Sequence, residues 1–128
     1  MLRSLHAEVV AMGSRSAASA PTRAAGTPFS CTEDAWFWTV GALRSRLEGA
    51  RHGGAHVPRP CEPDDVVRCL DSLYRQRRID LSHARVLRVW GERQMRPDRC
   101  RARGGECQLW QEAMTRLDPV LRQKGIVA

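Results

Sequence analysis

The apolar positions from residue 31 onwards recur every three to four residues, which is the period of a helix and not of a strand. Between residues 31 and 51 the spacing is four, three, four and three, which predicts one helix with a single apolar stripe. Ser30 followed by Glu33 fits a capping box at the start of this helix. The predicted stripe consists of Trp36, Val40, Leu43, Leu47 and Ala50.

Residues 63 to 91 predict two more helices, joined by a turn of about three residues. Pro63 suits the first position of the earlier helix, where a missing amide hydrogen costs nothing. Asp80 is the expected N-cap of the later helix and Gly91 its expected stop. The positions that we expect to face inward are Val66, Val67, Leu70, Leu73 and Tyr74 on the earlier helix and Leu81, Ala84, Leu87 and Trp90 on the later one.

The last part of the chain predicts a helix over residues 106 to 118. Pro119 is expected to interrupt it, so that Asp118 caps a short final helix that Gly125 closes. No segment alternates like a strand. We therefore predict an all-α fold, a small bundle of four or five helices that contains a helix-turn-helix-like pair. The expected inward positions here are Leu109, Trp110, Met114 and Leu117, with Ile126 and Val127 folded back on the core.

The composition divides the chain into two parts. Residues 1 to 28 are rich in Ser and Ala and poor in acidic residues, which predicts a flexible basic tail. An Arg- and Ser-bearing start of this kind also fits an organellar transit peptide. Residues 29 to 128 form the predicted helical domain, with the helix-turn-helix-like unit at residues 63 to 91.

The chain carries a net charge of +7, and the excess is local. Residues 63 to 103 hold eleven Arg against six Asp or Glu, whereas residues 31 to 62 and 104 to 128 are balanced. A local basic excess favours binding to a polyanion. Twenty of the 21 basic residues are Arg, which a GC-rich genome also favours, so a solvated basic face is the alternative.

The helix-turn-helix interpretation assigns a role to these arginines. In such a motif the second helix enters the major groove of DNA and the flanking basic residues contact phosphates. The turn lacks the glycine that this motif often contains. The candidate nucleic-acid-binding residues are Arg75, Arg77, Arg78, Ser82, His83, Arg85, Arg88 and Arg93.

A protein-interaction adaptor is the alternative function. The chain has four Trp, and Trp36, Trp38 and Trp110 need not all fit in a core of about 100 residues. A Trp left exposed is a common anchor of protein interfaces.

Chemical motifs are missing from the sequence. It has no phosphate-binding loop, and adjacent Asp64 and Asp65 would point ~100° apart on a helix, so we expect neither enzymatic activity nor a cofactor. No stretch approaches the ~20 apolar residues of a membrane span, so no membrane partner is expected.

The cysteines do not form a metal motif. Seven residues separate Cys61 from Cys69 and six separate Cys100 from Cys107, which is too wide for a zinc knuckle. No secretory signal precedes the cysteines, so reduced thiols are expected, with a zinc site that also uses His83, or a disulfide within either pair, as alternatives.

Three strings of the sequence carry a resemblance. PRPCEPDDV, LYRQRRIDLSHARVLRVWGER and LRQKGIVA together resemble a set of short, uncharacterised basic bacterial proteins, over residues 29 to 128. The resemblance implies a bacterial cytoplasmic setting, makes a transit peptide less expected and brings no activity. The resulting expectation is a small non-enzymatic accessory or regulatory protein that binds DNA.

Overall fold

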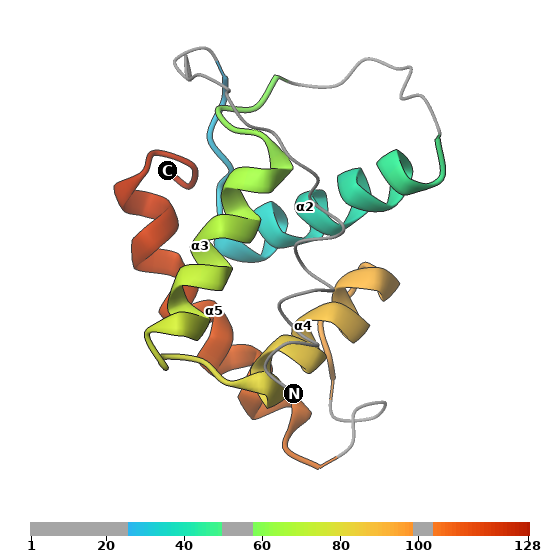
Figure 1. Ribbon diagram of the computed structural model, residues 1–128, viewed down its shortest axis with the longest axis vertical. Coiled ribbons are helices and arrows are strands. Elements are labelled where there is room, and N and C mark those ends of the chain that lie inside the picture. The colour runs from blue at the N-terminus through green and yellow to red at the C-terminus, as the bar shows by residue number, and fades with distance from the viewer. Residues whose placement is uncertain (1–25, 50–57, 99–103) are drawn as a thin grey trace.

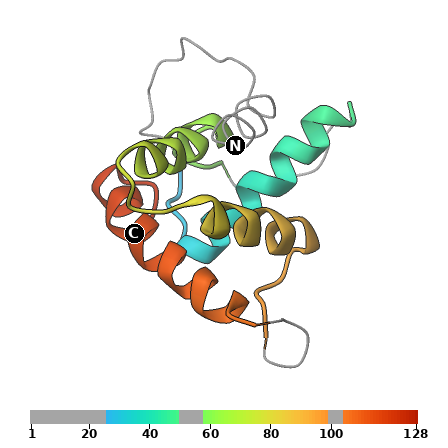
Figure 2. The same cartoon turned by 60° about the horizontal axis from the view of Figure 1, so that its bottom comes forward.

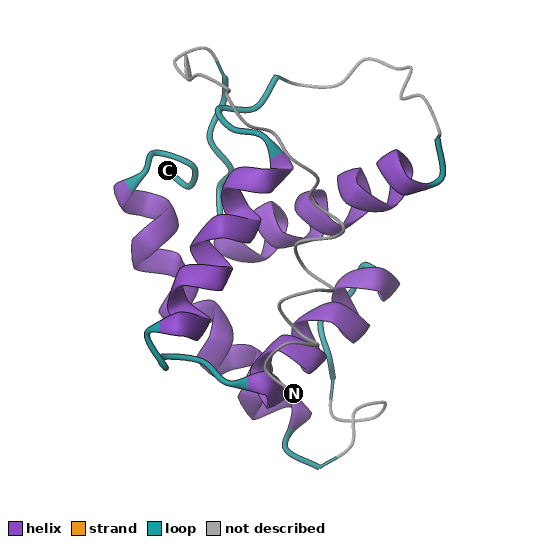
Figure 3. Cartoon of the chain, in the orientation of Figure 1, coloured by secondary structure: helices purple, strands orange, loops and turns teal. Residues whose placement is uncertain are grey.

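The computed structural model describes residues 26–49, 58–98 and 104–128 of the protein. These residues form four helices, α2 (Thr32–Leu47), α3 (Pro63–Arg75), α4 (Leu81–Arg93) and α5 (Glu106–Gln123), which confirms the predicted all-α fold (Figure 1). The described residues contain no strand (Figure 3), only an isolated parallel bridge between Phe29 and Val127. Residues 1 to 25 of the predicted tail lie outside the described residues, as does Ala50.

Helices α2 and α5 hold the bundle together. Each of them packs against both α3 and α4, and they also contact each other. The two helices that are neighbours in the chain, α3 and α4, make fewer contacts with each other than any other pair, although a short connection joins them (Figure 1). The helices of a helix-turn-helix unit pack directly on one another. The structure therefore does not confirm the predicted pairing.

Aromatic side chains fill the core between the helices. Trp36, Trp90 and Trp110 are buried, at most 5% exposed. Trp38 is half-buried and lies against Phe29, with 5.2 Å between the ring centroids. The possibility that Trp36 or Trp110 is left exposed is thereby excluded.

Helices α2 and α4 cross at Gly91, which lies inside α4 and does not stop it as predicted. A Cβ atom at Gly91 would lie 2.8 Å from Nε1 of Trp36 and 2.9 Å from Cγ2 of Val40. The indole N–H of Trp36 donates to the carbonyl oxygen of Leu87 at 3.0 Å, one turn before Gly91. Glycine is required here because any side chain would force the helices apart.

The start and end of α2 both differ from the prediction. Its N-cap is Cys31 and no side chain caps it, so the capping box from Ser30 is wrong. Glu33 instead accepts a hydrogen bond from Nε1 of Trp110 on α5 at 2.8 Å. The helix ends at Leu47, which is 64% exposed and so is not part of the buried stripe. The predicted starts of α3 at Pro63 and of α4 after Asp80 are confirmed.

Helix α5 continues through Pro119, so the predicted break is wrong. Leu117 and Leu121 on either side of Pro119 are fully buried, and this packing outweighs the missing backbone hydrogen bond. Asp118 is not a cap; its carboxylate accepts from Oγ1 of Thr32 on α2 at 2.7 Å. The helix closes at left-handed Gly125, as predicted, and Ile126 and Val127 fold back on the core.

The crossing at Gly91 gives a prediction with a matched control. We expect Gly91→Ala to lower the free energy of unfolding by about 1–2 kcal/mol, because overpacking costs ~1–3 kcal/mol and alanine returns up to ~1 kcal/mol of helix propensity. Gly41 lies inside α2 and its added Cβ would approach no atom closer than 3.8 Å, so Gly41→Ala should be neutral or stabilising. Urea unfolding of both variants measures the difference; equal effects would contradict the close crossing.

Candidate nucleic-acid interface

The turn between α3 and α4 has a defined backbone. The amide of Arg77 donates to the carbonyl of Tyr74 at 3.0 Å, and the amide of Arg78 donates to that of Leu73 at 2.9 Å. This is a Schellman motif, and it places Arg77 in the left-handed region at φ 61°. Ile79 is 3% exposed and anchors the turn in the core. The side chains of Arg77 and Arg78 are therefore held on the surface.

All four helices end next to a left-handed residue, and α2 and α5 use glycine there. At the end of α4 the position is Gln94, whose Nε2 donates to the carbonyl oxygens of Phe37 at 3.0 Å and Gly91 at 2.8 Å. Arg77 makes no such bond through its side chain within residues 26–49, 58–98 and 104–128. The left-handed residues at these four helix ends are Gly49, Arg77, Gln94 and Gly125.

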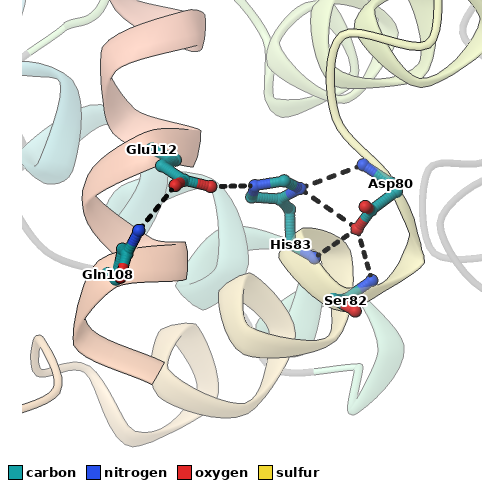
Figure 4. Close-up of polar contacts among 5 residues, drawn as sticks. All are labelled: Asp80, Ser82, His83, Gln108 and Glu112. Carbon is teal, nitrogen blue, oxygen red and sulfur yellow. Dashed lines mark hydrogen bonds and ion pairs between the residues drawn. The ribbon is translucent and has the colours of Figure 1, made fainter. Parts of the chain in front are cut away.

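A reciprocal pair of hydrogen bonds between Asp80 and His83 caps the first turn of α4. Asp80 Oδ1 accepts from the backbone amides of Ser82 at 2.9 Å and His83 at 3.4 Å. In return, the backbone amide of Asp80 donates to Nδ1 of His83 at 3.0 Å. The amides that begin α4 are thus already satisfied by Asp80, as Figure 4 shows.

His83 fastens α4 to α5 and does not face outward. It is 6% exposed, and its Nε2 lies 2.9 Å from Oε1 of Glu112 (Figure 4). Because Nδ1 accepts from the Asp80 amide, the neutral ring carries its proton on Nε2 and donates it to Glu112. The prediction that His83 is an outward contact to nucleic acid is therefore wrong. Sequence reasoning missed Glu112; an Asp-x-x-His at a helix start was the only signal for the His83 side of this link.

The link to His83 also sets the chemistry of Glu112. The hydrogen bond from His83 lowers the pKa of the Glu112 carboxyl below its ordinary value, and the amide of Gln108, which donates at 3.1 Å, lowers it further. Both bonds stabilise the ionised carboxylate. Glu112 therefore keeps its charge, and its hold on α4, to a lower pH than a free glutamate would.

The outward face of α4 carries the other predicted residues. Ser82, Arg85 and Arg88 are all exposed, as predicted. Arg93 is exposed as well, with its guanidinium carbon 4.5 Å from the ring centroid of Trp90. The guanidinium of Arg93 therefore already contacts a residue of its own helix.

Ion pairing separates the exposed arginines into two groups. Arg75 pairs with Asp71 at 3.1 Å, so one predicted contact already has an acidic partner. Within the ranges that the structure describes, Arg77, Arg78 and Arg85 form no ion pair with a carboxylate. The other arginines that pair with a carboxylate are Arg44, Arg46, Arg68, Arg96 and Arg122.

The cysteines offer no further chemistry in the described residues. No disulfide joins Cys61 to Cys69, so that alternative is not formed; Cys100 lies outside the described ranges. Burial raises the pKa of the Cys69 thiol, which keeps it protonated and unreactive. No three metal-ligating side chains come together in the part of the chain that the structure describes. None of its four helices combines the length and the apolar character that a membrane span requires.

Comparison with known proteins gives no relative: no family model matches the chain, and neither the curated proteins nor the solved structures contain a significant match.

The left-handed turn residues predict opposite effects of the same substitution. We expect Arg77→Gly to stabilise the fold by about 0.5–1 kcal/mol. A side chain in the left-handed region costs ~1–2 kcal/mol, and the greater entropy of the unfolded chain with glycine offsets ~0.4–1 kcal/mol of the gain. Gln94→Gly removes the same backbone strain, but it also removes the two hydrogen bonds of the Gln94 side chain. We therefore expect it not to stabilise the fold. Thermal and urea unfolding would contradict this account if Arg77→Gly were destabilising.

The lowered Glu112 pKa predicts a pH dependence of stability. A carboxylate with a lowered folded-state pKa stabilises the fold above its unfolded pKa of about 4.3, and the contribution is lost as the pH falls through the folded value. We therefore expect the difference in unfolding free energy between the wild type and Glu112→Gln to shrink as the pH falls below about 4.

Asp118 provides the comparison for this measurement. Its pKa is lowered mainly by the hydrogen bond from Thr32 and then by that from Arg122, and neither of these partners is shared with Glu112. The stability difference between the wild type and Asp118→Asn should therefore also shrink at acid pH, independently of Glu112. Urea unfolding from about pH 6 to pH 3 measures both variants. A gap between the wild type and Glu112→Gln that stays constant across this range would contradict the role of the His83–Glu112 bond.

Proposed function

We propose that this protein is a non-enzymatic accessory or regulatory protein that binds nucleic acid through the α3–α4 turn and the outer face of α4. The contact residues are Arg77, Arg78 and Arg85, with Ser82 and Arg88 on the same helix face. The resemblance to short basic bacterial proteins supports a bacterial cytoplasmic setting for this role.

Arg77 is the observation that carries the proposal. A left-handed position at a helix end favours glycine, and α2 and α5 have glycine there. A cation near a helix C-terminus gains ~0.3–1 kcal/mol from the dipole, but Arg75 already lies in the last turn of α3. A left-handed arginine whose side chain has no bonding partner among the described residues is explained if its charge is needed by a ligand.

The distribution of ion pairs also favours this surface. Several exposed arginines on the described helices pair with a carboxylate three or four residues away, as Arg68 does with Asp65 at 3.2 Å. Arg77, Arg78 and Arg85 leave their charge available to an external anion. Phosphates along a nucleic acid are the polyanion that such arginines suit.

The adaptor alternative has less support. An interface anchor would need an exposed large apolar side chain. Among the described residues only Leu47, at the end of α2, meets that condition. A single exposed leucine is common on proteins that bind no partner there.

Binding across a salt series tests the proposal. We expect the protein to bind a DNA duplex at about 50 mM salt and to lose affinity steeply by about 200 mM, because each phosphate contact releases a counterion. Arg78→Ala and Arg85→Ala should each weaken binding and reduce the magnitude of the salt slope by about 1.

Arg68→Ala is the charge-matched control. It removes the same unit of charge from an exposed, ion-paired position on α3, so it should leave both the affinity and the slope nearly unchanged. Absence of binding at low salt, or an equal effect of all three substitutions, would reject this surface as the nucleic-acid interface.

A further inference from the structure

The aromatic residues limit which kind of nucleic acid this surface can hold. Proteins that bind single strands stack the unpaired bases on exposed aromatic rings. All seven aromatic residues of the chain fall within the described ranges, and none of them is exposed. On the helices that flank the turn, Trp90 is 1% exposed and Tyr74 is packed against the core.

Two of the half-buried rings also pack against other aromatic rings of the protein. Phe37 stacks on Trp110 with 5.6 Å between their centroids, and Trp38 lies against Phe29. The cations nearest to rings, Arg59 over Phe29 and Arg93 over Trp90, cover those faces as well. Among the described residues, no aromatic ring is exposed as a stacking platform for an unpaired base.

The start of α4 offers little for reading base edges. Adenine is read mainly by Asn and Gln and cytosine by Asp and Glu, whereas Arg reads guanine only when it is not held by phosphates. In the first turns of α4 the outward side chains are Ser82, Arg85 and Arg88, while the Asp80 carboxylate is occupied by the amides of α4. The helix-turn-helix pairing that would insert a recognition helix into the major groove is not confirmed, because α3 and α4 contact each other only weakly.

What this surface does present is arginines on backbone positions that are fixed. The backbone bonds of the Schellman motif hold Arg77 and Arg78, buried Ile79 anchors them, and Arg85 lies on a helix fastened to α5 through His83. Cations on a rigid backbone suit phosphates that are themselves held at regular positions, because neither backbone loses much freedom on binding. A double helix has such phosphates and a single strand does not.

We infer that the nucleic acid bound by this surface is a double helix, held through its phosphates and without selection of base sequence. This inference rests on the proposed function. It adds the form of the ligand, and the contacts it assigns to Arg77, Arg78 and Arg85 are to phosphate oxygens.

Competition between defined DNA probes tests the inference. The full-length protein is titrated into a labelled duplex of about 20 base pairs, a length that covers several phosphate contacts. The other probes are one strand of that duplex and a second duplex of unrelated sequence. We expect the duplex to bind at least about tenfold more tightly than the single strand, and the two duplexes to agree within about threefold.

Two paired variants assign the binding to this surface. The double variant Arg78→Ala with Arg85→Ala should lose at least about tenfold in duplex affinity. Arg44→Ala with Arg68→Ala removes the same charge from ion-paired positions and should lose much less. Circular dichroism of both variants checks that the helices are retained.

The outcomes separate this inference from the function on which it rests. Single-strand binding as tight as duplex binding, or a preference above about tenfold for one duplex sequence, would overturn the inference while leaving a nucleic-acid-binding protein. A failure to bind any probe at low salt would reject the proposed function itself.

Discussion

The close crossing of α2 and α4 at Gly91 is the constraint on which the other packing depends. With no side chain at Gly91, the ring of Trp36 lies directly on α4 and its indole N–H reaches the carbonyl oxygen of Leu87. This contact fixes the position of α4 against α2, and α5 then packs on both. The outward face of α4, with Arg85 and Ser82, is the side that remains after this packing.

Hydrogen bonds from buried or half-buried side chains complete the attachment of α5. Glu33 accepts from Trp110, Thr32 donates to Asp118, and His83 donates to Glu112. Each bond joins α5 to another helix and each uses a carboxylate that is not left unsatisfied, so these polar groups select one arrangement of the helices. The same His83–Glu112 bond holds the start of α4, where the proposed interface begins.

Helix type, approximate position and inward faces could be predicted from the sequence because they depend on the local period of apolar residues. The inward residues of α3 and α4, such as Leu73 and Leu87, and the N-cap Asp80 are examples. Gly91, Pro119 and His83 were interpreted wrongly because their roles depend on partners far along the chain: Trp36 for Gly91, the packing on either side of Pro119, and Glu112 for His83. Of the candidate site, exposure of the arginines followed from the pattern, but pairing of Arg75 with Asp71 and stacking of Arg93 on Trp90 did not.

The bridge between Phe29 and Val127 has a consequence for the order in which the protein folds. Its two hydrogen bonds, from the Phe29 amide to Ile126 and from the Ala128 amide to Phe29, join segments separated by almost the whole described chain. The entropy of closing so long a loop opposes the contact until the intervening helices have brought its ends together. We therefore expect pairing of Phe29 with the C-terminal segment to be a late step, which follows the assembly of α2 to α5.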